Sequence, residues 1–168
     1  MHASLRCLLI MAALSLAACG FQLRGEVKLA SNLQRVYVTS SDTYGPLKHN
    51  VEAALTRAGA KIEMAPGEGI AHINMTGVGV TTVVASVGAN ARVNEFNMVY
   101  HVDLEINDGA GKTVFEKQPI EQTRSFTFDQ TQAIGTGSEQ DLIRREMERD
   151  MAQAIMRKIN VLERKFSQ

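Results

Sequence analysis

The sequence contains only two cysteines among its 168 residues, Cys7 and Cys19. Both lie near the amino terminus, so the rest of the chain has no thiol with which to form a disulfide bond. This excludes the disulfide framework that is typical of small secreted domains. A hydrophobic core must stabilise the chain instead, and a domain of about 150 residues buries roughly 70% of its unfolded surface, which is sufficient for such a core.

The sequence also lacks an excess of charge of either sign, with 18 lysines and arginines against 18 aspartates and glutamates. Residues 19–168 keep 17 of the basic and all 18 of the acidic residues, because Arg6 lies before them. Nucleic-acid binding requires a concentrated basic surface. We therefore expect no nucleic-acid partner.

No arrangement of residues typical of a catalytic or metal centre is present. His49, His72 and His101 show neither of the spacings that place two metal ligands on one helical face. The chain has no Gly-x-Ser-x-Gly motif, and no cysteine follows Cys19 to act as a nucleophile. Asp103 and Glu105 share one face of a predicted strand, where paired acids usually face solvent. The sequence therefore predicts a protein without enzymatic activity, metal or cofactor.

The amino terminus has the pattern of a secretory signal peptide. Arg6 precedes an uncharged run from Cys7 to Ala18, which at about 12 residues is shorter than the roughly 20 that span a bilayer. The run ends in Leu16-Ala17-Ala18-Cys19, which resembles a bacterial lipobox and implies cleavage before a lipidated Cys19. The alternative, an ordinary secreted protein, leaves an odd thiol unexplained.

Three segments follow from this assignment. Residues 1–18 are a signal peptide that is removed, residues 19–34 are the lipidated amino terminus and a tether, and residues 35–168 form a single domain. Acyl chains hold such a domain on a membrane without a spanning helix. Gly20 stands where lipoproteins of the inner membrane typically carry Asp, which favours the outer membrane.

The first half of the domain predicts a strand, a helix and a long strand. Alternating valines indicate a strand at 35–39. Pro46 suits the first helical position, an apolar face follows to residue 58, and Gly59 can close the helix. Residues 70–87 form a strand whose apolar phase switches near Gly77 and Gly79, which predicts a bulge or bend there.

The second half predicts two more strands and a long helix. The clearest strand covers 98–106, where Met98, Tyr100, Val102, Leu104 and Ile106 alternate with polar residues. A loop rich in Gly and Asn leads to a strand at 112–128, and Pro119 makes that strand an edge strand or places the proline at a bulge. A helix begins at Ser138 and carries one apolar stripe at Ile143, Met147, Met151, Ile155, Ile159, Leu162 and Phe166. The stripe is either core or, in its last turns, a docking surface.

These elements predict an α+β domain, with two helices packed on one face of a four-stranded mixed β-sheet. The order is strand, helix, three strands and helix. Because a helix connects the first strand to the second, we expect the sheet to be mixed rather than purely antiparallel.

Several short motifs resemble one family. The opening Cys19-Gly20-Phe21-Gln22-Leu23-Arg24 is similar to the mature amino terminus of the LptE family of lipopolysaccharide (LPS) assembly lipoproteins. Tyr44-Gly45-Pro46-Leu47, Arg124-Ser125-Phe126 and Glu139-Gln140-Asp141 follow at matching distances. The resemblance spans nearly the whole mature chain, and the fold of the family agrees with the predicted one.

The resemblance implies a non-catalytic outer-membrane lipoprotein. Such proteins plug the LptD β-barrel, support its assembly and bind LPS on its way to the outer leaflet. Family members are thought to meet LPS near the segments that correspond to residues 88–94 and 130–137. Here the first segment offers Arg92, and the second has no Lys or Arg. Arg92 is therefore the candidate LPS-binding residue, followed by Lys112, Lys117 and Arg124.

Two other classes of function compete with this interpretation. A lipoprotein hydrolase would need a nucleophile and a base, and the sequence offers no motif for either. An adaptor subunit of another envelope transport or barrel-assembly machine could have the same anchor and a similar α+β body. Identifying the proteins that copurify with the chain would discriminate between them.

Overall fold

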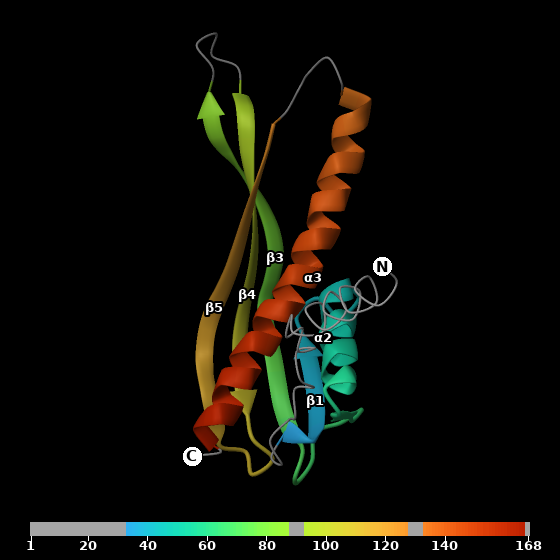
Figure 1. Ribbon diagram of the computed structural model, residues 1–168, viewed down its shortest axis with the longest axis vertical. Helices are drawn as coiled ribbons and strands as arrows, with labels where there is room; N and C mark the ends of the chain where they lie inside the picture. The colour runs from blue at the N-terminus through green and yellow to red at the C-terminus, as the bar shows by residue number, and fades with distance from the viewer. Residues whose placement is uncertain (1–32, 88–92, 128–132, 167–168) are drawn as a thin grey trace, which may run out of the picture.

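The computed structural model describes residues 33–87, 93–127 and 133–166. Five strands form one sheet in the order β2-β1-β3-β4-β5, and two helices accompany it (Figure 1). The elements are β1 Arg35–Ser40, α2 Pro46–Arg57, β2 Lys61–Ile62, β3 Ala71–Val87, β4 Val93–Asn107, β5 Thr113–Thr127 and α3 Ala133–Phe166. β1 runs parallel to β2 and β3, whereas β3–β4 and β4–β5 are antiparallel. The prediction of a mixed sheet is therefore confirmed.

The sheet has five strands, so the prediction of four is wrong. The additional strand, β2, contributes only the pairs Arg35–Lys61 and Val36–Ile62 at the edge beside β1. Two residues are too few for the alternation of apolar and polar side chains to reveal a strand. Backbone hydrogen bonds hold β2 in place, from Lys61 N to Gln34 O at 2.7 Å and from Glu63 N to Val36 O at 2.8 Å.

Helix α2 begins and ends where the sequence predicts. Pro46 occupies the first turn, where its missing N–H removes no helical hydrogen bond. At the other end Gly59 has a φ of 92°, and hydrogen bonds run from Gly59 N to Thr56 O and from Ala60 N to Leu55 O. This pair of bonds is a Schellman motif, which requires the left-handed conformation that glycine adopts freely. Buried Ala60 and Leu55 complete it.

The core lies between the helices and one face of the sheet. Leu33, which precedes β1, is 1% exposed and belongs to the same core cluster. The predicted inner face of β4 is confirmed, and so is most of the apolar stripe of α3. The buried residues are Met98, Tyr100, Val102, Leu104 and Ile106 on β4, and Met147, Met151, Ile155, Ile159 and Leu162 on α3. Ile143 is partly buried against this cluster.

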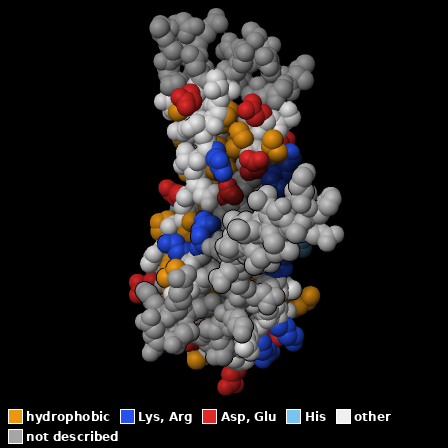
Figure 2. Space-filling model, in the orientation of Figure 1, with side chains coloured by type: hydrophobic (Ala, Val, Ile, Leu, Met, Phe, Trp, Pro, Cys, Tyr) orange, Lys and Arg blue, Asp and Glu red, His pale blue; other side chains and the backbone are white. Residues whose placement is uncertain are grey.

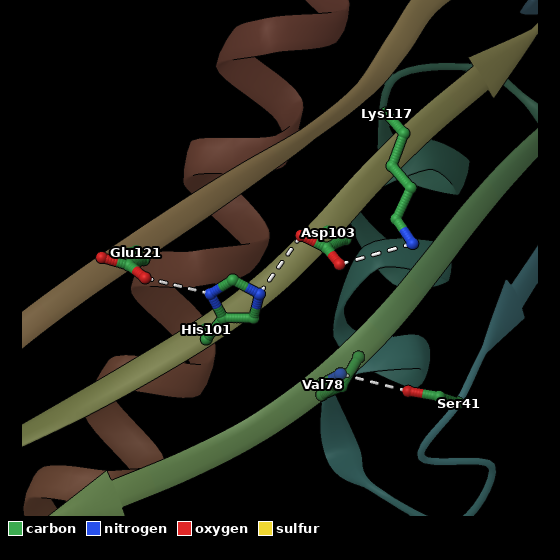
Figure 3. A network of polar contacts seen from close by, with 6 residues as sticks. All are labelled: Ser41, Val78, His101, Asp103, Lys117 and Glu121. Carbon is green, nitrogen blue, oxygen red and sulfur yellow. Dashed lines mark hydrogen bonds and ion pairs between the residues drawn. The ribbon is translucent and has the colours of Figure 1, made fainter.

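Strand β3 changes phase at Gly77, as its apolar pattern predicts. Gly77 has a φ of 60°, and the β3–β4 register shifts between Thr76 and Gly79. The backbone N–H of Val78, freed at this bulge, donates to Ser41 Oγ at 3.1 Å (Figure 3).

β5 pairs only with β4 in the described sheet, so Pro119 lies on an edge strand as expected.

Helix α3 is longer than predicted, because it begins at Ala133 rather than Ser138. Gly135 and Gly137 lie within its first turns, and each glycine costs a helix interior only about 1 kcal/mol relative to alanine, which the rest of a long helix can offset. With the β3–β4 hairpin, α3 extends well beyond β1 and α2 at one end of the molecule (Figure 1). Neither of the described helices combines the length and apolar character needed to cross a membrane.

Candidate partner-binding face

The face of the sheet opposite the helices carries polar side chains from four strands. We call it the polar sheet face and define it by Thr39, His72, Asn74, His101, Asp103, Lys117 and Glu121. Successive side chains of a strand point to opposite faces, so these residues alternate with the core residues of the same strands. Figure 3 shows α2 and α3 behind the strands that carry this face.

His101 is the centre of a charged cluster on the polar sheet face. Its Nε2 lies 3.2 Å from Asp103 Oδ1, and its Nδ1 lies 3.1 Å from Glu121 Oε1 (Figure 3). Lys117 Nζ lies 3.5 Å from the other oxygen of Asp103. Lys117 and Asp103 form an ion pair, and such a pair at the surface contributes about 0–1 kcal/mol to stability. The cluster therefore shapes the surface that the sheet presents more than it stabilises the fold.

A second set of contacts joins β1 to β3 on the same face. Thr39 Oγ1 donates to Asn74 Oδ1 at 3.0 Å and lies 2.8 Å from His72 Nε2. Because the single hydroxyl proton is used on Asn74, the Thr39 oxygen accepts from a protonated His72 Nε2. The His72 ring also stacks on Tyr37, with centroids 5.3 Å apart. These contacts fix the side chains of a two-strand surface that neither α2 nor α3 covers.

Among the described residues, Glu63 and Tyr100 have pKa values displaced by their surroundings. Hydrogen bonds from Arg35 and Lys61 lower the pKa of Glu63 at the β2 edge. Burial raises the pKa of Tyr100 to about 12, and the negative charge of Glu148 acts in the same direction. The buried hydroxyl of Tyr100 therefore stays neutral at any physiological pH.

The structure describes three of the candidate site residues, Lys112, Lys117 and Arg124. Cys19 and Arg92 both lie outside the described residues. Of the further candidates, Lys117 pairs with Asp103, and Arg124 Nη2 lies 2.6 Å from Asp150 Oδ2. Lys112 is exposed at the β4–β5 turn. The second candidate segment, 130–137, is helical from Ala133 onward.

His49, His72 and His101 lie on three different elements. His49 is exposed on α2, His72 lies near the start of β3, and His101 lies on the polar face of β4. Within the described ranges, no three His, Cys, Asp or Glu side chains are grouped so that they could hold a metal ion.

Sequence reasoning missed a groove between α2 and α3, lined by arginines from both helices. The only signal was the eight-residue spacing of Arg149 and Arg157, which puts both on one side of α3. Arg57 of α2 lines the same groove. The sequence could not show this, because it depends on how the two helices pack in the tertiary structure.

The chain is thus a small α+β domain with its core on the helix side of the sheet and the polar sheet face on the other. The family model LptE, described as lipopolysaccharide-assembly, matches residues 33–159, and the chain belongs to this family. Membership makes it a non-enzymatic lipoprotein of LPS assembly in the cell envelope.

Curated relatives and a solved structure agree with this assignment. LPS-assembly lipoprotein LptE from Pectobacterium atrosepticum is 30% identical over 152 residues, covering 89% of this chain and 80% of that protein. LptE from Yersinia pestis is 28% identical over 159 residues, covering 94% and 76%. The solution structure of lipoprotein B from Nitrosomonas europaea has a TM-score of 0.71 at 26% identity, covering 84% of this chain and 90% of that one.

Proposed function

We propose that the protein plugs the LptD β-barrel, supports its assembly, and assists LPS transport to the outer leaflet. The observation that carries this proposal is the polar sheet face, which neither α2 nor α3 covers and which presents charged and polar side chains from four strands. The interior of a large outer-membrane barrel is polar and water-filled. A domain enclosed there must be hydrophilic on every side, including the side of its sheet that the helices do not cover.

The distribution of charge on the opposite side supports the same proposal. Figure 2 shows acidic and basic side chains interspersed on the visible part of the face that carries α3. A surface that carries both acidic and basic side chains can form ion pairs with charged groups of either sign. A plug needs this versatility, because the wall of a lumen surrounds it.

The proposal includes lipid anchoring at the outer membrane through Cys19. Two or three acyl chains, at about 0.8 kcal/mol per buried methylene, give a stable anchor. Buried Leu33 attaches the start of the described chain to the core. The tether between Cys19 and Leu33 can span at most roughly 46–50 Å when fully extended, which limits the distance of the domain from the membrane that holds its lipid.

We also propose that Arg92 contacts LPS phosphate. In the sequence it lies between Val87, the last residue of β3, and Val93, the first of β4. The planar guanidinium matches phosphate oxygens with two parallel hydrogen bonds. Lys117 and Arg124 are weaker candidates than the sequence alone indicates, because both already face carboxylates.

Charge reversal on the polar sheet face tests the plug. Asp103→Arg with Glu121→Arg should reduce LptD copurification from outer membranes, and thermal unfolding should confirm that the variant folds, since ion pairs at a surface contribute little to stability. Asp141→Arg with Glu146→Arg makes the same change of charge at exposed positions of α3 and shows whether any loss of LptD is specific to the polar sheet face. Undiminished LptD recovery with the first variant would exclude the polar sheet face from the contact. Recovery of a different envelope complex with the wild type would favour the adaptor hypothesis.

A further inference from the structure

Strand β3 has a free edge along the part of its length that extends beyond β1. The two strands pair from Val36–Ala71 to Ser40–Met75, and their last backbone hydrogen bond runs from Ser41 N to Met75 O at 2.9 Å. No strand of the described chain continues in the place of β1 beside the rest of β3. Figure 1 shows β3 as the strand farthest from α3 at this end of the molecule, so the helix does not cover the edge.

Backbone N–H groups along this edge have no partner strand in the described chain. The N–H of Val78 donates to Ser41 Oγ at 3.1 Å, so it points toward the β1 side of the strand (Figure 3). Because alternate residues of a strand point their N–H groups to the same side, those of Val80, Thr82 and Val84 point to the β1 side as well. A row of unpaired N–H and C=O groups is a template for one more strand.

The free edge of β3 carries neither charge nor proline. Natural edge strands usually contain such residues, which discourage pairing with another chain. On the opposite edge of the sheet, β5 follows this rule with Lys117 and Pro119. Residues 78–87 of β3 contain no Lys, Arg, Asp, Glu or Pro, and Val83 and Val84 are 44% and 53% exposed. An uncharged, exposed run rich in β-branched residues pairs readily with another strand.

The geometry of the edge specifies the length and pattern of the strand that fits it. The β3–β4 register is uninterrupted from Gly79–His101 to Val84–Phe96 and shifts at both ends. This regular stretch has room for one strand of about six residues, or roughly 20 Å. Val80 packs against the core cluster on the helix side, whereas Thr81 is exposed on the other face. The fitting strand therefore alternates apolar and polar residues.

Strands of outer-membrane β-barrels have this alternation, with apolar residues toward the lipid and polar residues toward the lumen. In a closed barrel every strand is paired on both sides, so no strand is available to another protein. We propose that the free edge of β3 binds an unpaired strand of an outer-membrane β-barrel protein before its barrel closes. In naming LptD as that protein, this inference rests on the proposed function.

The test uses matched variants of the full mature chain at the two edges of the sheet. Thr82→Pro removes the central N–H of the β3 edge. Thr123→Pro removes an outward N–H from the β5 edge, since Thr123 has the same phase as Pro119 in an uninterrupted register. Thr82→Lys and Thr123→Lys instead add a charge and keep the backbone N–H. Both threonines are exposed, and thermal unfolding should confirm that each variant folds.

The probes are synthetic peptides of about ten residues, the length of a membrane-spanning β-strand, each copying one strand of LptD. Scrambled peptides of the same composition lack the alternation. At least one LptD peptide should bind the wild type and both Thr123 variants alike, and both Thr82 variants at least tenfold more weakly, whereas the scrambled peptides should not bind. In the wild type, the bound peptide should slow amide hydrogen exchange at Val80, Thr82 and Val84 at least tenfold, because these N–H groups gain acceptors.

The outcomes separate this inference from the proposed function. If no LptD peptide binds, or if the Thr82 variants bind as tightly as the Thr123 variants, the β3 assignment is overturned, while copurification of LptD still supports the plug. If strand peptides bind at the β3 edge but LptD does not copurify with the wild type, the edge is supported and the proposed function fails. If raising the concentration of the wild type alone protects the same amides, and Thr82→Lys abolishes a dimer seen by analytical ultracentrifugation, the edge binds a second copy and the barrel-strand assignment is wrong.

Discussion

Gly77 lies directly against Asp103 of the neighbouring strand, so that a Cβ placed on Gly77 would be 3.3 Å from Asp103 Oδ2. Asp103 also contacts His101 and Lys117. The bulge in β3 and the charged cluster of the polar sheet face are therefore one structural unit. A change at the bulge should be transmitted to the cluster.

Gly77→Ala should destabilise the protein by about 1–2 kcal/mol, because alanine resists the left-handed conformation that Gly77 adopts. Gly79→Ala is the matched control, since a Cβ there meets no atom within 4 Å and the φ is not positive. Urea denaturation of both variants measures the difference. Equal midpoints for the two variants would show that the bulge does not constrain residue 77.

Leu104→Ala should destabilise the fold by roughly 2–5 kcal/mol, the usual cost of a cavity at a fully buried leucine. Leu104 is 0% exposed on the inner face of β4. Glu105→Ala, one residue away on the opposite face, should change the free energy of unfolding by no more than about 0.5 kcal/mol. An unchanged denaturation midpoint for Leu104→Ala would contradict the packing of β4 on the helices.

Tyr100 should make the protein less stable in alkaline solution. Its pKa rises from 10.0 to about 12 on folding, so between these pH values the unfolded chain loses the phenolic proton while the folded chain keeps it. Stability is therefore fully present below pH 10 and falls as the pH rises toward 12. After allowance for solvent screening, the loss should be roughly 1–2 kcal/mol.

Tyr100→Phe isolates this contribution from the titration of lysines. The difference in unfolding free energy between wild type and variant, followed by urea denaturation from pH 9 to 12, should change only above pH 10. A constant difference across that range would mean that burial does not displace the pKa of Tyr100.

Arg92→Asp should weaken LPS binding, and more strongly at low salt, because screening reduces the effect of exposed charges. LptD copurification should persist, since the contact area of a plug is much larger than one side chain. Arg145→Asp, at an exposed position of α3, controls for the change in net charge. Equal LPS affinities for wild type and Arg92→Asp at low salt would remove Arg92 from the site and leave Lys112 as the next candidate.

Much of the fold could be predicted from the sequence, because long periodic patterns report which face of an element is buried. The alternation in β4 and the four-and-three spacing in α3 identified most of the core, and Pro46 and Gly59 marked both ends of α2. β2 was missed because two residues show no period. The first turns of α3 were missed because Gly135 and Gly137 lower the helix propensity of that segment. Tertiary context overrides such a weak local preference.

The candidate sites were less predictable. The polar sheet face followed from the alternation in β4, but its contacts from His101 to Glu121 and from Thr39 to His72 join strands whose register no local pattern reveals. The groove between α2 and α3 depends on the packing of two helices that are far apart in the chain. Cys19 and Arg92 remain predictions, since both lie outside the described residues.

The plug proposal is tested by affinity purification of the tagged wild-type chain from its native outer membrane, followed by mass spectrometry. LptD should be the dominant partner, recovered in equimolar amount, and the chain should begin at a diacylglyceryl-modified Cys19. Recovery of a different envelope complex without LptD would contradict the proposal.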